Sequence, residues 1–219
     1  LKMNSAVIVA AGSGNRLGQR TPKQFIPIHG QEILSYSVNT FFKHPKIDEV
    51  IIVTHPNWMD HVIQKYPRCQ VVKGGQSRHA SSLNGVLATS TKSINVLIHD
   101  AARPFISKEI ISNCLMALEN FDGSAPCISP NDSLIKWDGK KASFLNRKNI
   151  QLIQTPQCFK KEFILNILNQ KTSGTDEIGM VLNISPNSKL NFVKGNVENN
   201  KITTTNDLNY FKKTVPNGP

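Results

Sequence analysis

Short apolar runs alternate with longer amphipathic segments along the chain, which restricts the folds open to it. Residues 5–10 and 50–54 are continuous apolar runs, the pattern of strands buried on both faces of a parallel sheet. Further strands are expected at 71–72, 96–99 and 125–128. The helices expected between the strands cover 33–43, 58–66, 81–88 and 108–119. Such βαβ units predict an α/β fold with an open, mostly parallel sheet, whose ligands bind at the carboxyl ends of the strands.

The pattern changes after residue 128. Residues 131–150 hold several turn formers, including Asp132 and the pair Asp138-Gly139, between short extended pieces with little material for a core. We expect a projecting hairpin that serves as an oligomerisation arm or as a lid. Beyond it we expect helices at 160–169 and 176–182, a strand at 190–194 and a last helix from residue 206. These elements predict a single domain over residues 1–219, with an arm at about 131–150.

The formal net charge of +11 indicates anionic partners. The basic residues are scattered, several of them in glycine-containing loops, and no dense Lys/Arg run is interleaved with aromatics. This distribution suits a small polyanion at least as well as a duplex, so we expect no nucleic-acid partner. The four cysteines are far apart and form no C-x-x-C pair. No apolar run approaches the ~20 residues of a membrane span, and the N-terminus lacks a signal pattern, so we predict a cytoplasmic protein with no membrane partner.

The first candidate binding loop follows the apolar run at 5–10. Gly12 and Gly14 fail the spacing of the dinucleotide-binding fingerprint, and the loop lacks the Gly-Lys-Ser/Thr of a P-loop. Two interpretations remain, a row of backbone N–H groups facing an anion and a plain tight turn. Arg16 and Lys23 place two cations on this loop. Their presence favours a phosphate site, because fixed cations stabilise the charge that develops on a triphosphate under attack.

A second glycine turn, from Lys73 to Ser82, also leads from an expected strand into an expected helix. The backbone of Gly75 and the hydroxyl of Ser81 could contact the edge of a nucleobase. The structural alternative is that Ser77 or Ser81 only caps the helix.

The third loop reads H-D-A-A-R-P-F, from His99 to Phe105. Asp100 stands at the end of an expected central strand, which makes it a candidate metal-proximal acid. Arg103 could bind a substrate phosphate through two hydrogen bonds. The structural alternative is that Asp100 caps a helix with Arg103 as its partner. We expect His99 to have a structural role.

Taken together, these loops carry a family resemblance. The motifs are A-A-G-x-G-x-R with P-K-Q-F, G-G-x-x-R-x-x-S and H-D-A-A-R-P-F, followed by matches at 132–136, 154–159, 175–177 and 199–203. From Val7 to about Leu208 the chain resembles the 2-C-methyl-D-erythritol 4-phosphate cytidylyltransferases of non-mevalonate isoprenoid biosynthesis and their relatives that activate ribitol 5-phosphate. The resemblance implies a Rossmann-like nucleotidyltransferase fold (GT-A-like), with the hairpin as the arm of a homodimer.

The resemblance also implies an activity and a site. CMP would pass from CTP to the polyol phosphate with release of pyrophosphate, and Mg²⁺ would be held mainly by the CTP phosphates, with Asp100 as its candidate protein ligand. Arg16, Lys23 and Lys201 would stabilise the pentacoordinate α-phosphate. The implied nucleotide-binding residues are Ala10, Ala11, Gly12, Gly14, Gly75, Gln76 and Ser81. The implied polyol-phosphate site comprises Asp100, Arg103 and Thr155, with Ser133 and Arg147 contributed by the arm of the partner subunit.

Residue chemistry agrees with this activity, because an acceptor phosphate is already ionised and needs no general base, and the sequence offers no catalytic Ser or His arrangement. Some positions depart from the family pattern. Gln76 stands where some members have an acid, and Asn200 replaces an apolar residue. The resemblance implies 2-C-methyl-D-erythritol 4-phosphate as the acceptor, and these departures leave ribitol 5-phosphate or another polyol phosphate of surface polysaccharide synthesis as the alternative. The residues also leave open a purine or uridine nucleotidyltransferase, and a non-catalytic, nucleic-acid-binding protein of the same fold.

Overall fold

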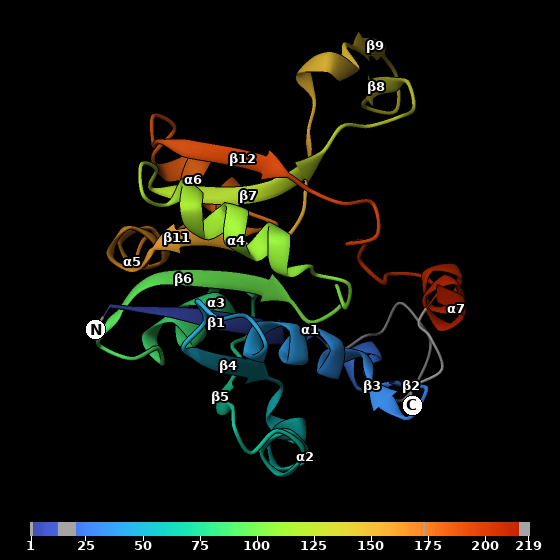
Figure 1. Ribbon diagram of the computed structural model, residues 1–219. Helices are drawn as coiled ribbons and strands as arrows, with labels where there is room; N and C mark the ends of the chain where they lie inside the picture. The colour runs from blue at the N-terminus through green and yellow to red at the C-terminus, as the bar shows by residue number, and fades with distance from the viewer. Residues whose placement is uncertain (1, 13–20, 173, 215–219) are drawn as a thin grey trace.

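The computed structural model describes residues 2–12, 21–172 and 174–214. Its centre is an eight-stranded sheet of order β10-β7-β11-β6-β1-β4-β5, with β12 also paired to β7 (Figure 1). The strands are β1 (Met3–Ala10), β4 (Glu49–Thr54), β5 (Gln70–Lys73), β6 (Ser93–Asp100), β7 (Gly123–Ile128), β10 (Leu152–Ile153), β11 (Gln157–Lys160) and β12 (Leu190–Lys194). The predicted α/β fold with a mostly parallel sheet is confirmed.

The pairings show where the sheet departs from the parallel pattern. β1 pairs in parallel with β4 and β6, β4 with β5, and β7 with β12. β11 is antiparallel to both β6 and β7, and β10 is antiparallel to β7. These two short strands were not predicted. Their place in the sheet comes from the neighbouring strands, because two to four residues carry too little periodicity to indicate a strand.

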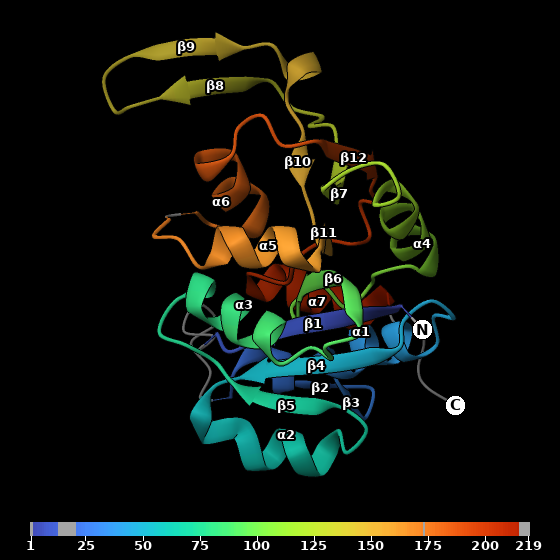
Figure 2. The ribbon, with the colours of Figure 1, turned by 90° about the vertical axis from the view of Figure 1, so that its left-hand side faces the viewer.

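The helices lie on both faces of the sheet. They are α1 (Ile33–Phe42), α2 (Met59–Lys65), α3 (Arg78–Leu87), α4 (Lys108–Ala117), α5 (Lys161–Leu168), α6 (Glu177–Ile184) and α7 (Thr205–Thr214). Figure 2 shows α3, α5 and α6 on the side away from α1 and α4. Side chains of β1 alternate between the two resulting cores, with Ile8 in the core under α1 and α4, and Val7 in the core under α3, α5 and α6. Burial on both faces explains why the strand is apolar throughout.

Helix starts follow side-chain caps. The hydroxyl of Ser77 accepts a hydrogen bond from the amide of Ala80, so α3 begins at Arg78 and not at residue 81 as predicted. Ser107 caps α4 and Asp176 caps α6 in the same way. The other expected helices are present within a few residues of their predicted ends. No helix in the described part of the chain is long and apolar enough to cross a bilayer.

A third, smaller core joins α7, at the C-terminal end of the described chain, to residues 26–33. Leu208 and Phe211 of α7 pack with Ile26, Ile28 and Ile202. Ile28 belongs to a small unpredicted hairpin of β2 (Pro27–Ile28) and β3 (Gln31–Glu32). The packing holds residues 23–28 beside residues 201–203.

The predicted hairpin is present. β8 (Leu134–Trp137) and β9 (Ala142–Leu145) form a separate two-stranded sheet. In both views this hairpin stands away from the central sheet at the end of extended connections (Figures 1 and 2). Ile135, Trp137 and Phe144 share one face of the ribbon and are 62%, 59% and 72% exposed.

Candidate active site

A cleft of about 990 Å³ opens at the carboxyl ends of the parallel strands. Its walls are the segments that follow β1, β4, β5 and β6, the edge predicted for ligand binding in such sheets. The cleft also receives Lys23, Gln24, Thr175 and Lys201 from segments distant in the sequence. The three loops singled out from the sequence therefore meet around one cavity.

The loop after β1 contributes Ala10, Ala11 and Gly12 to the cleft wall. The side-chain amide of Gln24 donates to the carbonyls of Ala10 at 2.6 Å and Gly12 at 3.0 Å. These bonds tie the short helix η2 (Lys23–Phe25) to the end of β1. Two predicted site residues of this loop, Gly14 and Arg16, lie outside the described residues.

Lys23 and Lys201 come from opposite ends of the chain and both line the cleft. The ammonium of Lys23 donates to the carbonyl of Ile202 at 2.6 Å. The packing of Ile202 in the small core under α7 thus fixes both cationic segments relative to each other.

The loop after β5 requires glycine at Gly74. A Cβ atom there would lie 2.4 Å from the Cβ of Ala11, so the first and second loops touch without room for a side chain. The amide of Gly75 donates to the hydroxyl of Ser81 at 3.1 Å, and both residues line the cleft beside Gln76. Because Ser77 is the cap of α3, Ser81 does not have that structural role.

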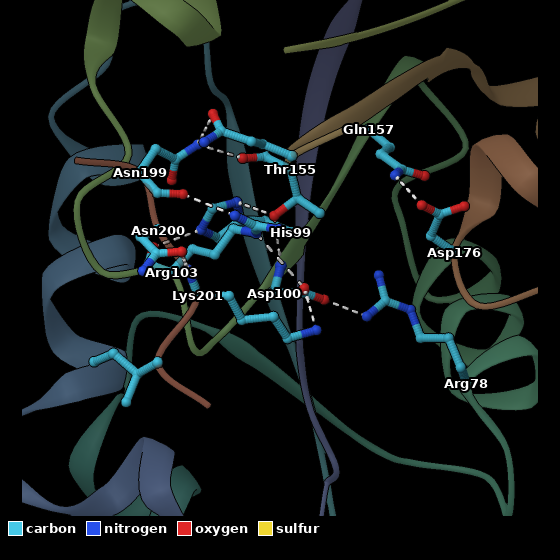
Figure 3. A network of polar contacts seen from close by, with 12 residues as sticks. Arg78, His99, Asp100, Arg103, Thr155, Gln157, Asp176, Asn199, Asn200 and Lys201 are labelled. Atoms are coloured by element: carbon cyan, nitrogen blue, oxygen red, sulfur yellow. Dashed lines mark hydrogen bonds and ion pairs between the residues drawn. The ribbon is translucent and has the colours of Figure 1, made fainter. Parts of the chain in front are cut away.

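Asp100 lies at the centre of a group of cations (Figure 3). Arg78 Nη1 donates to Asp100 Oδ1, and Lys201 Nζ lies 2.7 Å from Asp100 Oδ2. Arg103 Nε is farther from the same oxygen, at 3.8 Å. Burial alone would raise the pKa of Asp100, but the charges of Arg78 and Lys201 outweigh it and hold the pKa well below its usual range. Asp100 does not cap α4, because Ser107 does.

Among the residues that the structure describes, none form a protein-held metal centre. Both carboxylate oxygens of Asp100 are paired with cations, Oδ1 with Arg78 and Oδ2 with Lys201. A Mg²⁺ ion, which is also positively charged, would have to displace one of these two side chains. The described ranges contain no group of three or more His, Cys, Asp or Glu that could hold a metal ion. A divalent cation at this site would need its ligands from another source.

Thr155 and His99 lie behind Asp100, away from the cleft. The hydroxyl of Thr155 accepts from the amide of Asp100 at 3.1 Å and lies 3.0 Å from Nδ1 of His99. His99 Nε2 lies 2.9 Å from the carbonyl of Arg103. Burial lowers the pKa of His99 to about 4, so the ring is neutral at pH 7. Because His99 is buried and both ring nitrogens have partners within the protein, its role is structural, as expected from the sequence.

The side chain of Arg103 is held in a similar way, since one of its Nη atoms donates to the carbonyl of Asn199 at 2.8 Å.

Four described site residues that were predicted do not line the cleft of their own chain: Arg103 and Thr155 lie behind Asp100, and the other two belong to the arm. Ser133 and Arg147 are exposed at the base of the arm. The guanidinium of Arg147 donates to the carbonyl of Asn131 within the same segment. Figure 1 shows the arm at the opposite edge of the sheet from α2, and no residue of the arm is among those that line the cleft.

Arg78 and Glu177 had no role among the residues predicted from the sequence. Arg78 lines the cleft, and its guanidinium contacts both Glu177 and Asp100. Both residues stand inside motifs already recognised, G-G-x-x-R and T-D-E. The available signal was a charged residue at the start of each helix, but nothing in the sequence indicated that the two would pair.

Comparisons with known proteins agree with this geometry. The family model described as 2-C-methyl-D-erythritol 4-phosphate cytidylyltransferase matches residues 4–215. A protein of that name from Clostridium acetobutylicum is 40% identical over 226 residues, covering 97% of each chain. One from Thermotoga neapolitana is 31% identical, covering 94% of each. The crystal structure of 4-diphosphocytidyl-2C-methyl-D-erythritol synthase from Anaerococcus prevotii superimposes with a TM-score of 0.85 at 29% identity, covering 97% of this chain and 95% of that one. The chain belongs to the 2-C-methyl-D-erythritol 4-phosphate cytidylyltransferase family.

Proposed function

We propose that the chain transfers CMP from CTP to 2-C-methyl-D-erythritol 4-phosphate. A phosphate oxygen of the acceptor attacks the α-phosphorus of CTP, the bond from that phosphorus to the β-bridging oxygen breaks, and its electron pair leaves with pyrophosphate. The observation that carries the proposal is the meeting of two glycine loops with Lys23, Arg78 and Lys201 in one cleft, in a chain that matches the family from residue 4 to 215.

The proposed roles follow the charge that the reaction develops. Lys23 and Lys201, together with Arg16, stabilise the pentacoordinate phosphorus and the leaving pyrophosphate as fixed cations. The nucleotide contacts proposed are the loop of Ala10, Ala11, Gly12 and Gly14 and the residues Gly75, Gln76 and Ser81. The acceptor phosphate is already ionised at neutral pH, so positioning and charge neutralisation suffice and no side chain needs to take a proton.

The proposed acceptor side centres on Asp100, with Arg103 and Thr155 behind it. Arg103 and Thr155 do not line the cleft but support the loop that follows β6. Arg103 donates to the carbonyl of Asn199, and the hydroxyl of Thr155 accepts from the amide of Asp100. We propose that they act on the acceptor by holding this loop in place.

We propose that Mg²⁺ enters with CTP, bound to the triphosphate oxygens. The pairing of Asp100 with two cations supports this assignment over a cluster of protein carboxylates. When bound, the ion neutralises phosphate charge. Lys23 and Lys201, which line the cleft, would act on the same triphosphate.

We propose that the protein is a homodimer in which the arm of one subunit reaches the cleft of the other. Support comes from the shared, exposed face of Ile135, Trp137 and Phe144, because monomers rarely leave such an apolar face uncovered. Ser133 and Arg147 would then enter the partner's acceptor site. We further propose that the protein works in the cytoplasm.

Pyrophosphate release from CTP, measured with a panel of polyol phosphates, tests the proposed reaction. We expect turnover with 2-C-methyl-D-erythritol 4-phosphate and slower turnover with ribitol 5-phosphate. Faster turnover with ribitol 5-phosphate would move the assignment to that acceptor, and no turnover with any acceptor would overturn the activity. A thermal-shift comparison of CTP, UTP, GTP and ATP separates the base specificities. Salt-sensitive retention of DNA or RNA without CTP affinity would favour a nucleic-acid-binding protein instead.

A further inference from the structure

We propose that Glu177 is a positioning residue for cytidylyl transfer, which holds Arg78 so that Asp100 in turn keeps Lys201 in place. The inference rests on the proposed function and adds to it a residue that does not touch the substrates. Four charged groups of alternating sign connect α6, α3, β6 and the segment before α7; they are, in this order, Glu177, Arg78, Asp100 and Lys201. Glu177 and Arg78 are separated by 99 residues in the sequence.

Glu177 is fully buried, at 0% exposure, as the first residue of α6. Its two oxygens accept from Nε of Arg78 at 2.8 Å and from Nη2 at 2.9 Å. The hydroxyl of Ser82 donates to the same carboxylate at 2.5 Å. A buried carboxylate is costly unless it is fully paired, so this geometry is strongly determined. Glu177 thus sets both the position and the plane of the Arg78 guanidinium.

The guanidinium has one further nitrogen directed at the active site. Because the group is planar and rigid, the two bonds to Glu177 also fix Nη1, which donates to Asp100 Oδ1. Figure 3 shows Arg78 and Lys201 approaching the carboxylate of Asp100. Burial lowers and the two carboxylates raise the pKa of Arg78, and the net shift is upward, which keeps the bridge charged. Arg78 is thereby used to orient Asp100 and is not free to turn toward a phosphate.

Lys201 is the group that gains from this arrangement. Its ammonium lies on a flexible four-carbon stem, is 35% exposed and pairs with Asp100 Oδ2 at 2.7 Å. Asp100 can hold Lys201 in one place only while its other oxygen is anchored by Arg78. Misplacing a catalytic group by 1 Å can reduce a rate by about 10²-fold, so the anchor has a direct kinetic consequence.

The test is the variant Glu177→Gln, which keeps the shape of the side chain and removes its charge. We expect kcat to fall by about 10-fold or more while KM for CTP changes less than about threefold, since the lost effect is on transition-state positioning. The matched control is Ser82→Ala, which removes a hydrogen bond to the same carboxylate and leaves Arg78 paired. The control should keep kcat within about twofold of the unchanged enzyme, even if its melting temperature falls as far as that of Glu177→Gln.

A double-mutant cycle with Lys201→Ala, measured at high enzyme concentration in single turnovers, separates positioning from general damage. If Glu177 acts through Lys201, Glu177→Gln should have almost no further effect once Lys201 is absent. An equal fractional loss in both backgrounds would overturn the inference. So would a folded Glu177→Gln variant with kcat within about twofold of the unchanged enzyme.

If Glu177→Gln does not fold, Arg78→Lys replaces it in the same measurements. A lysine cannot bridge two carboxylates with a fixed fork, so the same loss of kcat is expected, and an unchanged kcat would overturn the inference. The unchanged enzyme serves as the reference for the proposed function. Its failure to release pyrophosphate would refute that function, whereas normal turnover beside a fully active variant would refute only the role of Glu177.

Discussion

The cleft and the arm are both made of polar loops and short strands, yet their side chains differ in where their interaction partners come from. Around the cleft, charged groups have partners from distant parts of the same chain, as in the pairs of Arg78 with Glu177 and Lys201 with Asp100. On the arm, the hydrogen bonds are local, and Trp137 and Phe144 face solvent. The described charged groups of the cleft thus find partners within the same chain, whereas the arm leaves apolar side chains exposed, which supports its proposed contact with a second subunit.

The largest expected effect concerns a cation of the cleft. Lys23→Ala should lower kcat by about 10²-fold or more, because a fixed charge is lost where the reaction develops negative charge. Steady-state kinetics with CTP measures the change, and Lys65→Ala, on the exposed surface of α2, is the control for loss of a positive charge. The same loss is predicted for Arg16→Ala. Activity within a few-fold of the unchanged enzyme would contradict the role given to these cations.

The second effect concerns the contact between the first two loops. Gly74→Ala should destabilise the protein by about 1–3 kcal/mol, because the new methyl group overlaps Ala11. Gly12→Ala is the matched control, since a Cβ there meets no atom of the described residues within 4 Å. Urea unfolding should place the control within about 0.5 kcal/mol of the unchanged protein. Equal stabilities of the two variants would mean that the loops are not packed as tightly as described.

The third effect is a pH dependence of the free energy of unfolding, which comes from the buried His99 behind Asp100. The pKa of His99 is lowered to about 4, so the unfolded chain takes up its proton first as the pH falls. The stabilisation is present above the unfolded pKa of about 6.5, and it decreases by about 1 kcal/mol per pH unit between pH 6.5 and 4. Urea unfolding at pH 7 and pH 5, compared with His99→Asn, measures this contribution. An identical pH slope in the two proteins would show that His99 is not buried in its neutral form.

The smallest effect on stability is expected for the arm. The double variant Ile135→Ser, Phe144→Ser should change the free energy of unfolding of the monomer by no more than about 0.5 kcal/mol, since both side chains are exposed. Sedimentation should nevertheless show a shift from dimer to monomer. Lys136→Ser, on the opposite face of β8, is the control and should leave assembly unchanged. If the unchanged protein is a monomer at every concentration tested, the proposed role of the arm in dimerisation is wrong.

Much of the fold and part of the site follow from local sequence. The apolar runs of β1 and β4 are continuous because their side chains face two cores, and this periodicity predicted both strands. Their loops had to meet at one edge of the sheet, so the joint lining of the cleft by Gly12, Gly75 and Asp100 could be anticipated. The arm was recognisable from its turn residues and its lack of core material.

Other features have no local signal. The contacts of Thr155 are an example: its hydroxyl accepts from the amide of Asp100 and lies beside the ring of His99, because the antiparallel insertion of β11 brings it behind the strand end. Likewise, nothing near Arg78 in the sequence shows that its partner is Glu177.

Periodicity and residue type were enough to predict the alternation of strands and helices, the two glycine loops and the cationic residues beside them. The position of β11, the pairing of Arg78 with Glu177 and the hydrogen bond from Lys23 to the Ile202 carbonyl depend on how distant segments come together in the fold. The physical reason is that buried charges and strand edges must be satisfied by whatever group the fold brings near, and that group is far away in the sequence.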